Sequence, residues 1–378
     1  MRLQEFLAKK PLFYKEIDYT RMPKAYALIK KRIKLPKIIH IVGTNGKGST
    51  GRFLSGIIKE AGYRVGHYTS PHILKFNERI WIDGRDIDDD SLEKAHQKLQ
   101  TLLPKEVSKA LSYFEYTTFL AAILFEDLDY AVMEAGLGGE FDATAVFENI
   151  LTLVTPIGLD HQDFLGRNVK EIAKTKLNAI QKRAVIGYQP YSEVKERAKS
   201  YPARFIKKDF SCYERVCERE GLAPYFAKNL ALAVEGAREL GIGVKDINTI
   251  VKYRLKARAQ RIRNVILDVG HNPMSAKALR EILRKDTVLV YNSFEDKDFK
   301  EILKILKPRI KRVEIIPVKS GRVVERGVLE RALRELGISY GDFLGLKDSE
   351  EYLVYGSFSV VEEFLKRESE ILRIFEKN

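Results

Sequence analysis

The segment KIIHIVGTNGKGST, from Lys37 to Thr50, is the clearest indication of the fold class. Its first six residues are rich in β-branched apolar side chains and predict a buried strand. Arg52–Ala61 then carries apolar residues at helical spacing. Between them, glycines let backbone N–H groups turn inward around a phosphate, and the helix N-terminus adds a positive dipole. The stretch predicts a nucleotide site with the candidate residues Thr44, Asn45, Gly46, Lys47, Gly48, Ser49 and Thr50.

Lys47 is the residue of this loop that can reach the terminal phosphates of a nucleotide. The spacing differs from the common GxxxxGK(S/T) form, because a hydroxyl residue follows Gly48 rather than the lysine. A structural turn with an incidental lysine is therefore the alternative interpretation.

Strand-like and helical segments alternate over the rest of the chain, which predicts an α/β class with a mainly parallel sheet. A first series runs up to the basic segment Arg258–Arg263, and a second, complete series follows it. We expect an ATP-binding domain over residues 1–260 and a smaller Rossmann-like α/β domain over residues 261–378. The expected elements are Tyr130–Ala135, Leu151–Pro156, Ala184–Gly187, Val265–Val269, Thr287–Tyr291, Val313–Val318 and Glu351–Tyr355 as strands, and Tyr225–Leu240, Ser275–Arg284, Phe299–Leu306, Val328–Leu336 and Val360–Phe375 as helices.

Composition indicates a globular enzyme. Hydrophobic residues make up 45% and charged residues 31% of the 378 residues. No run approaches the ~20 apolar residues that a membrane helix needs, and the N-terminus does not resemble a secretory signal. The two cysteines, Cys212 and Cys217, are too few for a disulfide framework or a zinc site. A cytoplasmic location is expected.

The net charge of +14 attracts anions in general. The positive residues are scattered along the chain, which favours a solvated charged surface. A P-loop ATPase that binds nucleic acid would instead show a concentrated basic or aromatic–basic patch, and the sequence contains none. We therefore expect no nucleic-acid partner, and this class of function remains the less favoured alternative.

An ordered set of motifs covers nearly the whole chain. The set comprises GTNGKGST, YTSPH (Tyr68–His72), FNERI (Phe76–Ile80), SYFEYTTF (Ser112–Phe119), EAGLGGEFDAT (Glu134–Thr144), GLDHQDFLG (Gly158–Gly166), LDVGHNP (Leu267–Pro273), EDKD (Glu295–Asp298) and YGSF (Tyr355–Phe358). It resembles the folylpolyglutamate/dihydrofolate synthase branch of the Mur ligases. The resemblance implies a P-loop Mur-ligase ATPase domain followed by the Rossmann-like C-terminal Mur-ligase domain.

The resemblance also assigns ligands and catalytic groups. Ser70, Glu134 and His161 stand at the family's Mg²⁺-binding positions, and two magnesium sites are implied. Oxygen ligands together with ATP phosphates and water suit Mg²⁺. Lys176 stands at the position of a lysine that is carbamylated by CO₂ to orient the second metal. The carbamate is a hypothesis, and a solvent-exposed helix lysine is its alternative. The implied catalytic residues are Lys47, Lys176 and His161.

Further positions resemble nucleotide and substrate contacts. Asn229 matches an adenine-contacting residue of the family, Asp268 and His271 match residues that approach the ribose and phosphates, and Arg258 matches a phosphate-contacting arginine, with Arg261 as its alternative. Arg21, Ser112, Phe114 and Phe141 fall in the region that resembles the pterin site.

Several residues depart from the family pattern. Glu140 replaces a cation of the GGRLDATN form, and Ala145 replaces its amide. Thr175, Leu177 and Asn178 replace the neighbours of the lysine in the EKAG pattern. If the missing cation normally holds an anionic group, the substrate site differs in this chain.

The implied reaction is ATP-dependent addition of L-glutamate to a reduced folate, and also to dihydropteroate, through an acyl phosphate. ATP and Mg²⁺ are the expected cofactors, and a monomer is the expected state. Another Mur-type amide ligase is the alternative, although the TNGKGS form and the SPHI and FNERI runs argue against a cell-wall enzyme. Such an enzyme would also carry an N-terminal UDP-binding domain, and only about 35 residues precede the first strand.

Overall fold

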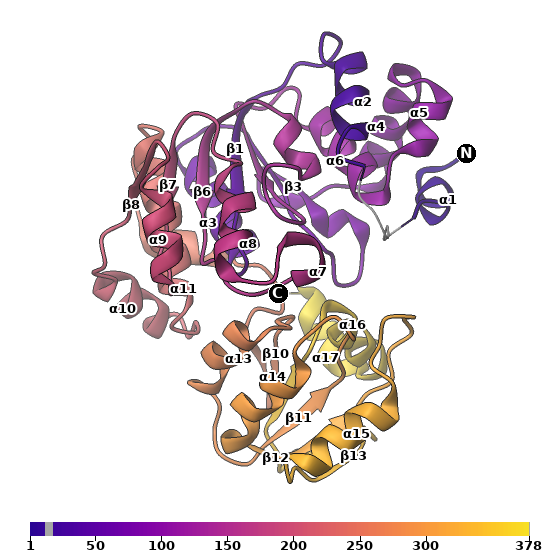
Figure 1. Cartoon of the computed structure of the whole chain (residues 1–378), viewed down its shortest axis with the longest axis vertical. Coiled ribbons are helices and arrows are strands. Elements are labelled where there is room, and N and C mark those ends of the chain that lie inside the picture. Colours follow the sequence, from indigo (N-terminus) through magenta and orange to yellow (C-terminus); the bar gives the residue numbers. More distant parts are fainter. Residues whose placement is uncertain (12–17, 378) are drawn as a thin grey trace. The chain divides into compact units, whose positions relative to one another are not determined.

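The computed structural model describes residues 1–11 and 18–377. The chain divides into two compact units (Figure 1). The first comprises Met1–Val216 and Ala227–Arg254, and the second comprises Cys217–Phe226 and Leu255–Asn378. The second unit thus includes a short segment that lies, in the sequence, between the two parts of the first unit. The expected boundary at residues 260 and 261 stays a prediction.

The first unit is built on an eight-stranded sheet with the order β4-β3-β2-β5-β1-β6-β7-β8. In this order, every pair of neighbours from β2 through β5, β1, β6 and β7 to β8 is parallel. The strand β3 pairs antiparallel with both β2 and β4. The strands are β1 (Lys37–Val42), β2 (Val65–Tyr68), β3 (Ile80–Ile82), β4 (Arg85–Asp86), β5 (Tyr130–Glu134), β6 (Asn149–Val154), β7 (Ala184–Ile186) and β8 (Ala203–Phe205).

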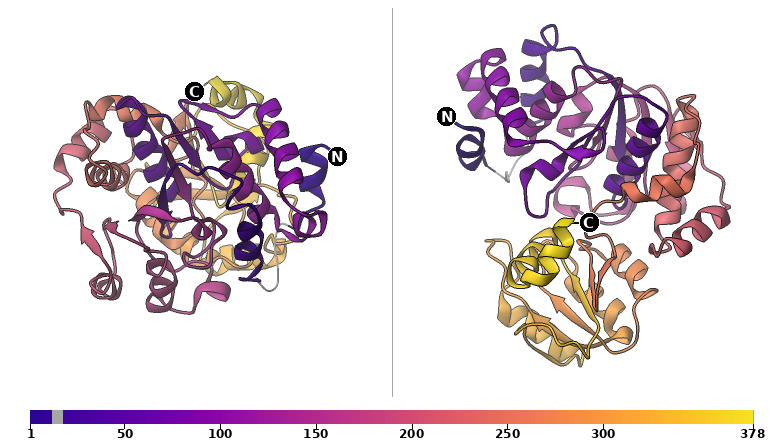
Figure 2. Two further views of the ribbon diagram at one scale, coloured as in Figure 1. Left: turned by 90° about the horizontal axis from the view of Figure 1, so that it is seen from above. Right: turned by 180° about the vertical axis from the view of Figure 1, so that it is seen from behind.

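Helices enclose this sheet (Figure 2). They are α1 (Leu3–Ala8), α2 (Arg21–Ile29), α3 (Lys47–Glu60), α4 (Asp89–Leu102), α5 (Lys105–Ala110), α6 (Tyr113–Leu124), α7 (Gln162–Leu165), α8 (Val169–Leu177), α9 (Ser192–Ala198), α10 (Ser211–Arg219), α11 (Phe226–Glu239) and α12 (Ile247–Ile250), with 3-10 turns at Phe76–Arg79, Ala143–Val146 and Val251–Tyr253. Residues Ile38, Ile39 and Ile41 of β1 are buried, as a central strand covered on both faces requires.

The second unit holds a six-stranded sheet with the order β13-β12-β11-β14-β10-β9, in which only β9 is antiparallel. Its strands are β9 (Gln260–Ile262), β10 (Val265–Leu267), β11 (Thr287–Tyr291), β12 (Ile310–Ile315), β13 (Tyr340–Asp342) and β14 (Tyr352–Tyr355). Its helices are α13 (Pro273–Arg280), α14 (Phe299–Leu306), α15 (Arg326–Glu335), α16 (Phe358–Arg367) and α17 (Ser369–Lys377), with a 3-10 turn at Lys307–Arg309. The α/β class and the Rossmann-like second sheet are confirmed.

Most expected elements are present, and the differences have local causes. The helix after the glycine loop begins at Lys47 rather than Arg52, because its first turn is made of small residues that carry no apolar stripe. The expected helix Val360–Phe375 is two helices, since the backbone leaves the helical region at Glu368. The expected helix Ser275–Arg284 is shorter and ends at Arg280. The expected strand Val313–Val318 lies three residues earlier, at Ile310–Ile315.

The sheet of the first unit brings several polar segments to one edge. The glycine loop follows β1, Thr69 and Ser70 follow β2, and Glu134 ends β5. Because these strands are parallel, their carboxyl ends meet at the same edge, which is where open α/β sheets bind ligands. No helix among the described residues has the length and apolar character needed to cross a membrane.

Candidate active site

Two glycines fit the loop between β1 and α3 into its surroundings. Gly43 has φ +144°, and a Cβ there would lie 1.9 Å from Thr155 Oγ1. Gly46 has φ +84°, and a Cβ there would lie 2.4 Å from the Asn229 side-chain oxygen. The loop therefore packs against the end of β6 and against α11. Asn229, the expected adenine contact, lies beside this loop, which spans Gly43–Gly46 and is called the phosphate loop or glycine loop below.

The backbone N–H groups of the loop and of the start of α3 differ in whether they have an acceptor. The N–H groups of Thr44 and Asn45 both donate to the Pro156 carbonyl, at 2.9 and 3.3 Å. The first N–H groups of α3, from Lys47 onward, have no acceptor within the helix by the geometry of a helix start. N–H groups at the start of a helix favour anions.

Replacing Gly46 with alanine tests this geometry. The variant is expected to lose at least about 1–2 kcal/mol of unfolding free energy from the left-handed backbone alone. It is also expected to weaken ADP binding by roughly tenfold or more, about 1.4 kcal/mol, because Asn229 and the loop must separate. Gly62→Ala is the matched control: it lies just after the other end of α3, at φ +96°, and a Cβ there would meet nothing within 4 Å. It should lose stability but keep ADP binding, as measured by denaturant titration and calorimetry. Equal ADP affinity in both variants would contradict the assigned loop.

Glu134 joins the ends of β2 and β5 to the phosphate loop. It is 6% exposed, and its Oε1 lies 4.0 Å from Lys47 Nζ. Its Oε2 accepts hydrogen bonds from the Thr69 hydroxyl and from the Ser70 N–H, the latter at 3.3 Å. Lys47 Nζ also donates to the Thr44 carbonyl at 3.3 Å. Of the expected metal ligands, Ser70 and Glu134 thus lie together, next to the lysine of the loop.

His161 lies on a loop that is fastened to the phosphate loop. The Thr44 hydroxyl donates to the Gly158 carbonyl and accepts from the Gly158 N–H, both at 3.0 Å. His161 has φ +50°, and its N–H donates to Asp160 Oδ1 at 2.9 Å. Its ring Nε2 lies 4.0 Å from the same oxygen. Ligation of a metal by His161 stays a prediction. Over residues 1–11 and 18–377, no three His, Cys, Asp or Glu side chains form a metal-binding group.

Lys176 is buried and points at the glycine loops. It is 4% exposed, and its Nζ donates to the Gly43 carbonyl at 2.9 Å and to the Gly138 carbonyl at 3.4 Å. The alternative of a solvent-exposed helix lysine is therefore wrong. The residue connects α8 with the loops that follow β1 and β5.

Burial also changes the acid–base behaviour of Lys176. Loss of hydration lowers its pKa to about 7, and the nearby cation of Lys47 acts in the same direction. The carboxylates of Asp160 and Asp142 oppose the shift. Near neutral pH, a large fraction of Lys176 is therefore a neutral amine, the form that can react with CO₂.

In the second unit, Asp268 is held at the end of β10. Its carboxylate accepts the N–H groups of Ala259 and Gly270, each at 2.7 Å, and the Tyr225 hydroxyl at 3.3 Å. Burial raises its pKa. His271 is three residues further on, with its ring Nδ1 3.1 Å from the Val269 carbonyl.

The structure distinguishes the two candidate arginines of this unit. The Arg258 guanidinium lies 5.0 Å from the Phe358 ring centroid and acts electrostatically on Asp268. Arg261 instead forms a surface ion pair with Glu351 at 2.6 Å. Arg258 is thus the one near Asp268, and which of the two contacts a nucleotide stays a prediction.

Arg21 and Ser112, two expected substrate residues, both bind Glu115. Arg21 forms a two-point ion pair with its carboxylate, at 2.7 and 3.1 Å. Ser112 caps α6, since its hydroxyl accepts the Glu115 N–H and its own N–H donates to the Glu115 carboxylate. These two residues therefore shape the start of α6.

The two expected aromatic contacts differ in exposure. Phe114 packs its ring on Tyr68, at 5.8 Å between centroids, and against Gly136. Phe141 is 56% exposed and lies 4.7 Å from the exposed ring of Tyr19. Of the two, Phe141 offers the free surface on which a flat ring could stack.

Three polar residues near this site were not singled out in the sequence. Thr69 bonds Glu134, Asp160 faces both His161 and Lys176, and Thr155 packs on Gly43. Thr69 and Asp160 stand directly beside expected metal ligands within the YTSPH and GLDH motifs. Their position next to these motif residues in the sequence was the available signal.

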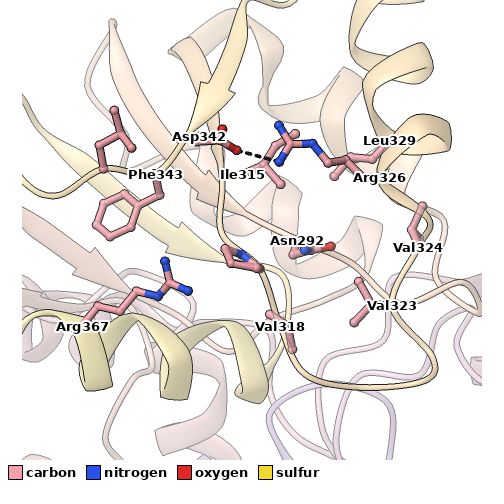
Figure 3. A pocket seen from close by; sticks show the side chains of 12 residues that line it. Asn292, Ile315, Val318, Val323, Val324, Arg326, Leu329, Asp342, Phe343 and Arg367 are labelled. Carbon is pink, nitrogen blue, oxygen red and sulfur yellow. Dashed lines mark ion pairs between the residues drawn. The ribbon is translucent and has the colours of Figure 1, made fainter.

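A separate cavity lies within the second unit (Figure 3). It has a volume of about 410 Å³ and is lined mainly by apolar residues at the end of β12, in the segment between β12 and α15, on α15 and directly after β13. Arg326 at its border is paired with Asp342 at 2.7 Å. None of the expected nucleotide or metal residues lines this cavity.

The first unit is thus a P-loop-like α/β unit in which a buried lysine and a buried carboxylate lie beside the glycine loop. No protein-family model matches the chain. A dihydrofolate synthase/folylpolyglutamate synthase of Buchnera aphidicola is 30% identical over 370 residues, covering 87% of this chain and 88% of the relative. The structure of Helicobacter pylori folylpolyglutamate synthetase is 37% identical with a TM-score of 0.79, covering 97% and 98% of the two chains. Escherichia coli FolC in complex with DHPP and ADP is 26% identical with a TM-score of 0.81, covering 98% of both chains.

The chain belongs to the dihydrofolate synthase/folylpolyglutamate synthase family. This confirms the family resemblance, the two-part Mur-ligase fold and the enzyme class, an ATP-dependent ligase.

Proposed function

We propose that this protein uses ATP to join L-glutamate to a reduced folate and to dihydropteroate. The observation that carries the proposal is the meeting of Lys47, Glu134 and Lys176 around the phosphate loop. ADP in the Escherichia coli FolC structures supports the nucleotide. The proposed nucleotide contacts are Thr44, Asn45, Gly46, Lys47, Gly48, Ser49, Thr50 and Asn229 in the first unit, and Arg258, Asp268 and His271 in the second.

The donor set beside Lys47 fits a magnesium ion. Glu134 is a buried carboxylate, and the adjacent Ser70 supplies a hydroxyl, both hard oxygen ligands of the kind that Mg²⁺ takes together with phosphates and water. His161 completes the proposed set, and a carbamylated Lys176 would orient a second ion. When bound, the metal neutralises charge on the transferring phosphoryl group.

The chain's own groups then have defined tasks. A carboxylate is a poor electrophile, so the γ-phosphoryl of ATP is transferred to it, and the glutamate amine displaces phosphate from the resulting acyl phosphate. Lys47, whose ammonium is held by the Thr44 carbonyl, faces the developing charge on the phosphoryl oxygens. The N–H groups at the start of α3 contribute in the same sense.

The pterin side of the substrate is proposed to lie near Phe141. Its exposed ring, next to Tyr19, can stack on a flat heterocycle, and Phe114 supports the neighbouring Gly136. Arg21 and Ser112 act on this region through Glu115 and the start of α6. The partners are small molecules, and the proposal includes a monomer that works without nucleic acid.

Product mass tests this assignment. The protein is incubated with Mg-ATP and glutamate, once with dihydropteroate and once with tetrahydrofolate. We expect one glutamyl unit on dihydropteroate and a ladder of glutamyl additions on tetrahydrofolate. A ladder on tetrahydrofolate alone would restrict the enzyme to polyglutamylation. Phosphate release without either product would contradict the folate assignment and favour another Mur-type acceptor.

A further inference from the structure

Side chains that depart from the family pattern fasten the loop after β5 to the end of α8. Asn178, the C-cap of α8, donates from its amide to Glu140 Oε2 at 2.7 Å. Tyr201 donates from its hydroxyl to the other side of the same amide, Asn178 Oδ1, at 2.5 Å. The Glu140 N–H donates to the Thr175 carbonyl at 3.0 Å. Glu140 is therefore bound to this helix end through both its backbone and its side chain.

The same loop is in direct contact with Lys176. A Cβ at Gly139 would lie 2.6 Å from the Thr175 carbonyl oxygen and 2.7 Å from Lys176 Cα, so the two backbones touch. The Gly138 carbonyl accepts the Lys176 ammonium at 3.4 Å. Residues 138–140 thus contact Lys176 at both ends of its side chain. A shift of this loop would move Lys176 or release it from one acceptor.

We propose that Glu140 and Asn178 are positioning residues that hold Lys176 at the phosphate loop. The inference rests on the proposed function, because it assumes that Lys176 takes part in ligation. In this proposal Glu140 acts through its oxygen, as the hydrogen-bond acceptor for Asn178, rather than through its charge. The two departures from the family pattern therefore belong together: the glutamate and the asparagine form one contact that neither would form alone.

The test separates the hydrogen bond from the charge. Glu140→Ala and Asn178→Ala each remove the contact, and each is expected to lower kcat roughly tenfold, because small misplacements of a reacting group cost about that much or more. The kcat of the double variant should be no lower than that of the less active single variant, since each single substitution already removes the same contact. Glu140→Gln keeps an acceptor oxygen and is expected to retain at least about half of kcat. KM for ATP should change less than kcat.

A second readout does not depend on ligation. Lys176 in the full-length protein is reductively methylated at one pH in CO₂-free buffer, and the modified peptide is quantified by mass spectrometry. We expect Lys176 to be methylated several-fold faster in Glu140→Ala and Asn178→Ala than in the protein without substitutions. Asn168→Ala is the matched control: it removes the N-cap of the same helix, where Asn168 accepts the Glu171 N–H at 3.0 Å. It should lower the melting temperature without faster modification of Lys176.

Two outcomes would overturn the proposal. One is a loss in Glu140→Gln as large as that in Glu140→Ala, which would assign the effect to charge. The other is unchanged modification of Lys176 in the alanine variants. If the protein without substitutions ligates no glutamate, the proposed function fails. The methylation experiment still decides whether Glu140 and Asn178 position Lys176.

Discussion

Replacement of Lys47 by alanine is expected to lower kcat/KM for glutamate ligation by about 10²–10³-fold, the cost of removing one preorganised donor that stabilises developing charge. Phosphoryl transfer offers the protein little covalent chemistry, so catalysis depends on positioning and electrostatics. The Lys47 ammonium is placed for this task at the start of α3, 3.3 Å from the Thr44 carbonyl and 4.0 Å from Glu134. Its loss removes a positive charge from the position where the transferring group accumulates negative charge.

Lys59→Ala is the control on the same helix. Lys59 lies in the last turn of α3 and donates to the Tyr253 hydroxyl at 3.3 Å. We expect it to keep kcat/KM within about twofold, because a surface contact of this kind contributes little. Steady-state rates at varied ATP separate the two cases. If Lys47→Ala behaves like Lys59→Ala, Lys47 is incidental and the glycine loop is only a structural turn.

The fold was predictable from the sequence where burial on both faces imposes a pattern. β1 reads as a strand because four of its six residues are isoleucine or valine without strict alternation, and a central parallel strand favours this composition. The start of α3 could not be read in the same way. Its first turn, from Lys47 to Thr50, is largely buried although its residues are small or polar, because tertiary packing around the glycine loop decides its environment.

The sequence allowed the proximity of some motif positions to be predicted, but not their individual contacts. Ser70 and Glu134 follow neighbouring parallel strands, so their proximity follows from topology. The burial of Lys176 does not follow from topology, because it depends on the approach of two loops that are distant in sequence. Sequence spacing also gave no sign that Arg21 would bind Glu115, 94 positions further along the chain.

Lys176 gives the second large expected effect. Lys176→Ala is expected to lower kcat by about 10²-fold, comparable to the loss of a group that orients a metal ligand. The pKa of about 7 leaves much of this buried amine neutral at pH 7 and above, and only the neutral amine attacks CO₂. The nitrogen–carbon bond forms, one proton leaves, and the product is a carbamate anion. Since acid protonates the amine, activity should decline as the pH falls through about 7.

Substitutions distinguish the carbamate from an ammonium role. Acetate or propionate added to Lys176→Ala should restore part of the activity, because a small carboxylate can replace the anionic end of the carbamate. Lys176→Arg keeps a cation that cannot be carbamylated, so it should be as inactive as the alanine variant. Nuclear magnetic resonance with ¹³C-bicarbonate would detect the adduct directly in the unmodified sequence. Activity in Lys176→Arg without any carboxylate would show that the positive charge is what the site needs, and the carbamate hypothesis would then be wrong.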